Sequence, residues 1–160
     1  MMDIGDKGII LERTKCIINS KLAGIYRKHG DIWFEFEKNE KTYVLLLQTF
    51  FRICNPEGVL VTDTDKYRAN GEQEDDFEWD SEGANAFDQW LMQYSSELAG
   101  GVFVTETEMN IYGDFIIRFN NDSFLVVYIE VTNDTECWRF FQKDDAEEND
   151  LIVFGNFIIH

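Results

Sequence analysis

The chain has 160 residues, of which 44% are hydrophobic and 15% aromatic, and its 31 acidic and 14 basic side chains give a formal net charge of −17. This composition indicates one packed domain over residues 1–160 and excludes a disordered chain, while the charge disfavours nucleic acid and anionic membranes as partners. No apolar run is long enough to span a membrane and no signal peptide is recognisable. Three cysteines without a CxxC pair disfavour a disulfide framework, so we expect a cytoplasmic protein.

The acidic side chains are concentrated in the second half of the chain. Residues 1–71 carry 11 Lys or Arg and 10 Asp or Glu, whereas residues 72–160 carry 3 and 21. A field of this sign attracts a basic protein and speeds its association. We therefore expect a basic protein partner; the alternative is that the charge only keeps the domain in solution.

The first half of the chain reads mainly as short strands. Its apolar residues come in short runs or alternate with polar ones, which is the period of a strand that buries one face. The expected strands are 9–18, 22–26, 32–37, 43–53 and 59–62. A polar turn at 38–41 joins the third and fourth runs into a hairpin, and Asn55-Pro56-Glu57-Gly58 is typical of a type I turn.

An acidic segment over 72–83 follows and is predicted to be a loop. Its centre combines carboxylates with two aromatic rings, which makes it the expected contact with a partner. The residues concerned are Glu74, Asp75, Asp76, Phe77, Glu78, Trp79 and Asp80. Aromatic side chains in such a loop either anchor it to the core of their own domain or insert into a partner, and both interpretations stay open.

One amphipathic helix is predicted over 85–99. Its apolar side chains follow the spacing of a single helix face. They are Phe87, Trp90, Leu91, Tyr94 and Leu98. Asn85 is a typical N-cap residue, and Gly100-Gly101 is suited to end the helix in a left-handed turn.

Strand patterns return after this helix. The expected strands are 102–106, 114–120, 124–132 and 136–141, followed by a hairpin of 151–154 and 157–160. The second and third form a hairpin around a polar turn, and Gly155-Asn156 suits the tight turn of the last one. A run of acidic residues at 144–150 is expected to be an exposed loop.

Several short apolar patterns occur twice in the same order. Leu22-Ala23-Gly24 is echoed by Leu98-Ala99-Gly100, and Phe51-Arg52-Ile53 by Trp138-Arg139-Phe140. We therefore expect a β-rich α+β fold with mainly antiparallel sheets from two similar, pseudo-symmetric β repeats. The repeats cover approximately 9–71 and 98–160, and they are joined by the acidic loop 72–83 and the amphipathic helix 85–99.

Arg52 and Arg139 occupy matching positions in these repeats. Each follows a large aromatic residue inside an apolar strand, where an arginine needs a carboxylate or an aromatic face as its partner. The two arginines are therefore either structural or a pair of ligand anchors.

No motif in the chain carries recognisable catalytic chemistry. There is no Walker loop or dinucleotide-binding glycine pattern, and two histidines with three scattered cysteines do not form a zinc motif. We expect no catalytic residues, no cofactor and no metal.

In charge alone the chain is similar to small acidic immunity proteins and antitoxins. The predicted function is a non-catalytic binding protein that neutralises a basic partner. The alternatives are a small-molecule-binding or enzymatic β domain with a pocket between the repeats, and a structural or accessory domain.

Overall fold

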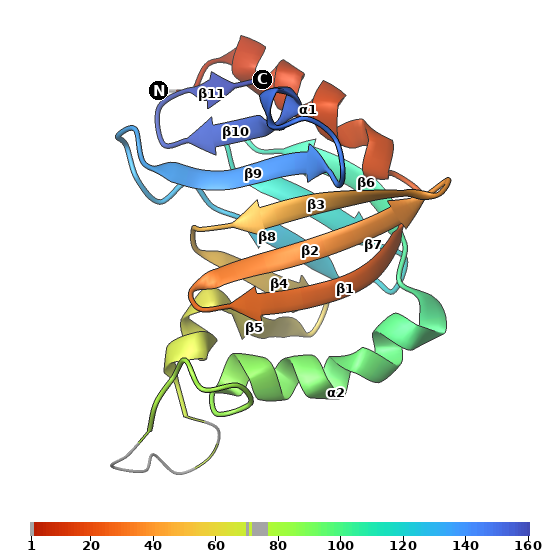
Figure 1. Ribbon diagram of the computed structural model, residues 1–160, viewed down its shortest axis with the longest axis vertical. Helices are drawn as coiled ribbons and strands as arrows, with labels where there is room; N and C mark the ends of the chain where they lie inside the picture. Colours follow the sequence, from red (N-terminus) through yellow and green to blue (C-terminus); the bar gives the residue numbers. More distant parts are fainter. Residues whose placement is uncertain (1, 70, 72–76) are drawn as a thin grey trace.

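The computed structural model describes residues 2–69, 71 and 77–160, which form two antiparallel sheets and two α-helices (Figure 1). The strands of the first sheet, in spatial order, are β1 (Lys21–Lys28), β2 (Asp31–Lys38), β3 (Lys41–Leu47), β9 (Glu136–Gln142), β10 (Leu151–Phe154) and β11 (Ile158–Ile159). Those of the second sheet are β5 (Gly58–Thr62), β4 (Phe51–Asn55), β8 (Phe124–Val127), β7 (Phe115–Phe119) and β6 (Val104–Met109). The predicted β-rich α+β class with antiparallel sheets is confirmed.

The helices lie at opposite ends of the molecule, with α1 (Ile4–Thr14) at the top of Figure 1 and α2 (Ala86–Gly101) at the bottom. Three short 3₁₀ helices connect other elements: η1 (Lys15–Ile17), η2 (Asp63–Tyr67) and η3 (Glu147–Asn149). Helix α2 matches its prediction closely: the Asn85 side chain caps it by accepting a hydrogen bond from Asp88 N at 2.7 Å, and Gly101 ends it at φ +98°. Among the described residues, no helix is both long and apolar enough to cross a membrane.

The predicted opening strand at 9–18 is wrong, and the described residues form two α-helices rather than one. Residues 4–14 form α1, which begins in a capping box between Asp3 and Asp6. Ile10, Thr14 and Ile17 are buried at the spacing of a helix face, but the continuous apolar run around Ile10 hid that period.

The predicted strand 43–53 is divided between the two sheets. β3 ends at Leu47, and β4 begins at Phe51 in the second sheet. The crossing is held by Thr49, whose hydroxyl donates to Tyr128 O at 2.7 Å. An apolar run of this length therefore serves two strands joined by a short connection.

The two sheets face each other across one hydrophobic core. Phe51 of β4 meets Phe34 of β2 and Phe87 of α2, each with ring centroids 6.0 Å apart, so it joins both sheets and the helix. Phe115 of β7 stacks on Trp138 of β9 at 5.2 Å. All five side chains are fully buried.

The two sheets have the same order of connections. The chain first forms three neighbouring strands of the first sheet, β1 to β3, and then continues to β4 and β5 in the second sheet. It next forms three neighbouring strands of the second sheet, β6 to β8, and then returns to β9 and β10 in the first. The Leu-Ala-Gly echo does not correspond, because Leu22 lies in β1 and Leu98 near the end of α2. An internal duplication therefore stays a prediction.

Candidate functional site

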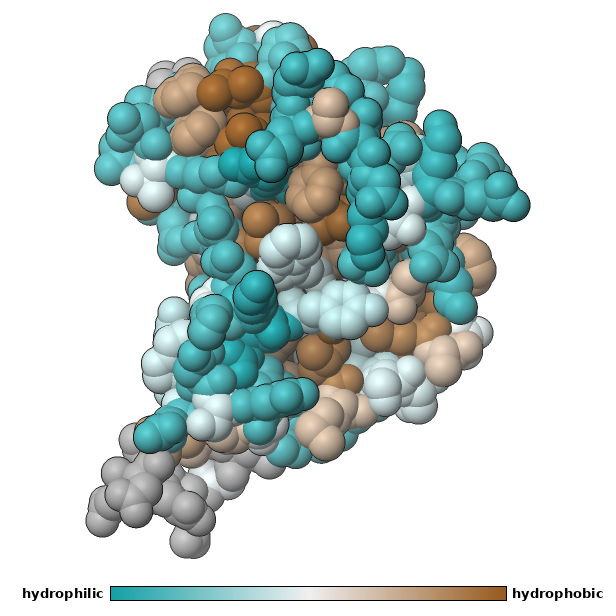
Figure 2. All heavy atoms as spheres, viewed as in Figure 1, coloured by the Kyte–Doolittle hydropathy of each residue, from teal (hydrophilic) through white to brown (hydrophobic). Residues whose placement is uncertain are grey.

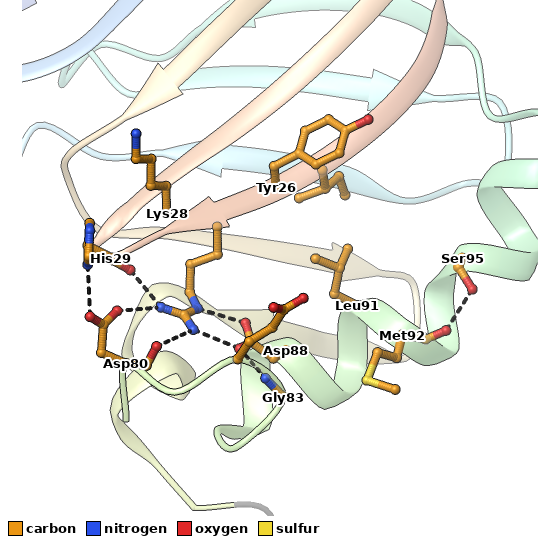
Figure 3. A pocket seen from close by; sticks show the side chains of 12 residues that line it. Tyr26, Lys28, His29, Asp80, Gly83, Asp88, Leu91, Met92 and Ser95 are labelled. Carbon is orange, nitrogen blue, oxygen red and sulfur yellow. Dashed lines mark hydrogen bonds and ion pairs between the residues drawn. The ribbon is translucent and has the colours of Figure 1, made fainter. Parts of the chain in front are cut away.

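A groove of about 480 Å³ lies between the second half of β1, the 80–83 segment and α2 (Figure 3). β1 is an edge strand of its sheet, and α2 packs against it through the apolar face that the sequence predicted. The groove is lined by Ile25, Tyr26, Arg27, Lys28, His29, Asp80, Glu82, Gly83, Asp88, Leu91, Met92 and Ser95. It therefore combines a charged end with an apolar end.

Arg27 is the centre of the charged end. Its Nε and Nη2 donate to the two carboxylate oxygens of Asp88 at 2.7 and 2.8 Å, and Nη1 donates to Asp80 Oδ1 at 3.0 Å. The backbone oxygens of His29 and Asp80 accept its two remaining N–H groups at 2.9 and 3.3 Å. All five donors of a largely buried guanidinium, with 6% of its side chain exposed, are therefore bonded within the protein.

Asp88 is also satisfied from a second direction. Its Oδ2 accepts a hydrogen bond from Gly83 N at 2.9 Å, which holds the 80–83 segment against α2. Burial alone would raise the pKa of the Asp88 carboxyl, but the hydrogen bonds from Arg27 and Gly83 outweigh it and lower the pKa. The pairing with Asp88 in turn raises the pKa of Arg27. This arrangement fastens β1, the segment and α2 together.

His29 and Asp80 form the exposed part of the network. His29 Nδ1 lies 2.8 Å from Asp80 Oδ2, and the histidine adopts the left-handed conformation at φ +54° in the turn after β1. A histidine oriented by a carboxylate is one half of a proton-transfer pair, which also needs a reactive group within reach. The hydroxyl of Ser95 instead donates to Met92 O at 2.7 Å, and Ser95 lies at the other end of the groove from His29 (Figure 3). The contact joins the turn after β1 to the 80–83 segment.

This network predicts a loss of stability in acid. The hydrogen bond from His29, followed by that from Arg27, lowers the pKa of Asp80, and the pKa of Asp88 is lowered as described. A carboxylate whose folded pKa lies below its unfolded value of about 4 stabilises the protein above that value, and the stabilisation is lost as the pH falls through the folded pKa. Urea unfolding between pH 2 and pH 7 should show this fall, and Asp80→Asn should make it shallower. An identical slope in the variant would contradict the assignment.

Part of the predicted partner-binding loop contacts the domain to which it belongs. Glu74, Asp75 and Asp76 lie outside the described residues. Phe77 is half-buried, and Glu78 is exposed. The Trp79 ring contacts the Tyr67 ring at 4.8 Å and lies 5.9 Å from the Arg27 guanidinium, while Trp79 O accepts a hydrogen bond from Asn85 at 2.8 Å.

These contacts, together with the Arg27–Asp80 pair, favour the interpretation in which the segment is anchored to its own core.

Arg52 and Arg139 are not brought together. Arg52 lies in β4 of the second sheet, exposed, with its guanidinium 5.4 Å from the Tyr128 ring. Arg139 lies in β9 of the first sheet and donates to both carboxylate oxygens of Glu136 at 3.0 and 3.1 Å and to Asp150 at 3.3 Å. Each arginine thus has a partner on its own sheet, as the structural interpretation expects.

The cysteine thiols offer little nucleophilic chemistry. Cys16, Cys54 and Cys137 are free, and burial raises the pKa of each, which lowers the fraction of reactive thiolate. Within the described ranges, no group of three or more His, Cys, Asp or Glu side chains is arranged to hold a metal ion. Comparisons of the chain with protein-family models, curated proteins and solved structures give no match.

Sequence reasoning missed the groove and its central pair. Arg27 and Asp88 are 61 positions apart, and each has an ordinary local explanation, as part of a basic turn and as a first-turn acidic residue of a helix. The sequence signal that could have indicated the pair was Asp88 itself. An acidic residue three positions after an N-cap interacts favourably with the helix dipole, but it can also form an ion pair with a basic residue outside its own helix.

Proposed function

We propose that the protein is a non-catalytic, cytoplasmic binding protein that holds a basic segment of a partner protein in the groove between β1 and α2. The observation that carries this proposal is the saturation of Arg27, whose five N–H groups are all bonded internally. A guanidinium in that state has no donor left for an anionic substrate. What the groove offers a visiting segment is its apolar walls and the Glu82 carboxylate on the 80–83 segment.

The apolar walls are large and accessible. Tyr26 on β1 and Met92 on α2 are both exposed, and Leu91 lies between them. Tyr26 is also the first member of a cross-strand row that continues through Trp33 of β2 and Leu46 of β3. Figure 2 displays this face, where apolar and aromatic side chains cross the molecule between hydrophilic margins. Such a surface suits the aliphatic or aromatic side chains of a protein segment.

Charge selects the kind of segment. Glu82 lines the groove, Glu78 is exposed in the segment that leads to it, and residues 72–160 carry 21 acidic side chains against 3 basic ones. Lys28 lies on the strand side of the groove, so a basic side chain of the partner would turn towards the 80–83 segment. Long-range attraction would speed the encounter, and the apolar walls would slow dissociation.

The test begins with affinity capture from the native host, followed by calorimetric titration of the captured protein at 0.05 to 0.3 M salt. We expect a basic partner whose Kd rises with salt. Met92→Ser and Glu82→Gln should each weaken binding by about 5- to 10-fold, or roughly 1 kcal/mol. The matched controls Val59→Ser and Glu57→Gln remove an exposed apolar side chain and an exposed carboxylate at the β4–β5 hairpin, and they should change nothing. A neutral or acidic partner with a salt-independent Kd would contradict the proposal.

Small-molecule binding is the second candidate, because a groove of about 480 Å³ falls within the usual size range of ligand sites. In this candidate function the ligand would lie in the β1–α2 groove. The expectation from the sequence is a pocket between the repeats, but that space is filled by the core side chains of Phe34, Phe51, Phe115 and Trp138. A thermal shift with small organic ligands that is lost in Leu91→Asp, without capture of any basic protein, would favour this candidate.

A further inference from the structure

A second surface, at the end of the molecule opposite the groove, exposes three large apolar side chains. Ile111 and Tyr112, in the turn between β6 and β7, are each 79% exposed, and Ile4 at the start of α1 is 87% exposed. Ile111 and Ile4 line the same hollow, so the three side chains form one patch with the turn. We call it the apolar tip. Exposure of this extent in a cluster is typical of an interaction site rather than of scattered surface residues.

The turn that carries the apolar tip is held by its own hydrogen bonds. The Asn110 side chain accepts from Tyr112 N at 2.9 Å and from Asp114 N at 3.0 Å, and it donates to the Asp114 carboxylate at 2.8 Å. Lys7 of α1 donates to Ile111 O at 2.7 Å. The apolar side chains are therefore presented by a backbone that is already ordered, which lowers the entropy lost on association.

The apolar tip has open surface hollows beside its protrusions. One hollow of about 500 Å³ is lined by Met2, Asp3, Ile4, Gly5, Lys7 and Ile111. Another of about 380 Å³ is lined by Met2, Ile111, Tyr112, Ile129, Val131, Thr132 and Gly155. A patch that holds both protruding side chains and hollows has the two features that a self-complementary, two-fold interface needs.

Charge decides between a second copy and a basic partner. Of the described residues that line the two hollows, Asp3 and Lys7 are the charged ones, so this lining is neutral on a chain of net charge −17. The carboxylate of Asp114 in the turn already accepts a hydrogen bond from the Asn110 side chain, so the hollows themselves hold no excess of acid to attract a basic protein. Two copies meeting here avoid local repulsion, and Asp3 of one copy can face Lys7 of the other. We propose that the apolar tip pairs with the apolar tip of a second copy to form a two-fold dimer.

The size of the patch indicates a weak, reversible dimer. Full burial removes on the order of 100 Å² from water for an Ile side chain and roughly 150–250 Å² for a Tyr side chain, so two Ile and one Tyr on each copy account for about 800 Å² in total. That lies at the low end of interface sizes, where association is weak and transient, so the dimer is expected only at high concentration.

Sedimentation velocity from 5 to 500 µM tests the proposal. The weight-average sedimentation coefficient should rise with concentration, and 0.5 M salt should strengthen the dimer relative to 0.05 M by screening the repulsion between two acidic chains. Ile111→Asp and Tyr112→Ser should each remain monomeric, with unchanged far-UV circular dichroism showing that they fold. The control Val59→Asp introduces the same charge at an exposed apolar position of β5 and should dimerise like the wild type.

A wild-type chain that stays monomeric to 500 µM at both salt concentrations would overturn this proposal, and so would a dimer that survives both tip variants. The outcome is separate from that of the groove, because Met92→Ser leaves the apolar tip intact and should not affect self-association. The two surfaces also respond to salt in opposite directions, since binding of a basic partner weakens as the dimer strengthens.

Discussion

Replacing Asp88 by alanine should lower the free energy of unfolding by about 3–5 kcal/mol, since it leaves the guanidinium of Arg27 buried and deprived of its main partner. The Arg27 side chain is 6% exposed and that of Asp88 is 11% exposed, so both are largely shielded from water and the two lost hydrogen bonds weigh heavily. Gly83 N loses its acceptor in the same substitution. For a chain of this length, the loss corresponds to a fall in Tm of roughly 6–20 °C.

Urea unfolding followed by tryptophan fluorescence measures this loss. The control is Glu108→Ala, which breaks a pair of two hydrogen bonds from Arg118 to one oxygen of Glu108, with N–O distances of 2.6 and 3.1 Å and side chains 33% and 44% exposed. An exposed pair of this kind contributes less than about 1 kcal/mol. Equal losses in the two variants would show that Arg27–Asp88 does not fasten the 80–83 segment to β1 and α2.

The fold was predictable where a segment has one dominant period. The alternation of Ile32, Phe34 and Phe36 with polar residues located β2, and the apolar stripe from Phe87 to Leu98 located α2. Prediction failed where apolar residues run without interruption: the run around Ile10 satisfies both a helix and a strand, and the capping box of Asp3 and Asp6 that decides for the helix lies outside it.

The site was much less predictable than the fold, because it is made of contacts between distant segments. His29 and Asp80 are 51 positions apart, and Arg27 and Asp88 are 61 positions apart. Counting acidic residues correctly placed the excess of charge in the second half, but it could not separate those engaged in internal pairs from those available to a partner. Asp80 belongs to the first kind and Glu82, which lines the groove, to the second.

The apolar tip shows the same limit. Ile111 and Tyr112 read as part of a connection between strands, and nothing local indicates that Lys7 lies against their backbone, 104 positions away. A hydrophobic pair within a turn of polar residues was the available signal, because turn positions are usually polar and exposed.

Phe51→Ala should be as damaging as the loss of Asp88, for an apolar rather than an electrostatic reason. The Phe51 ring contacts Phe34 of one sheet and Phe87 of α2, so its removal leaves a cavity where three elements meet. We expect a loss of about 3–5 kcal/mol for alanine and about 1 kcal/mol for Phe51→Leu, which fills most of the volume.

Phe157→Ala is the control for losing a phenyl ring at the surface, where Phe157 is 38% exposed and stacks on Phe154, and it should cost much less. Unfolding monitored by fluorescence and by far-UV circular dichroism should give coincident transitions in each variant, because one core supports both sheets. Separate transitions in Phe51→Ala would mean that the sheets are stabilised independently. In that case unfolding of the second sheet would still loosen the groove, because α2 packs on Phe51 and β5 of that sheet as well as on β1.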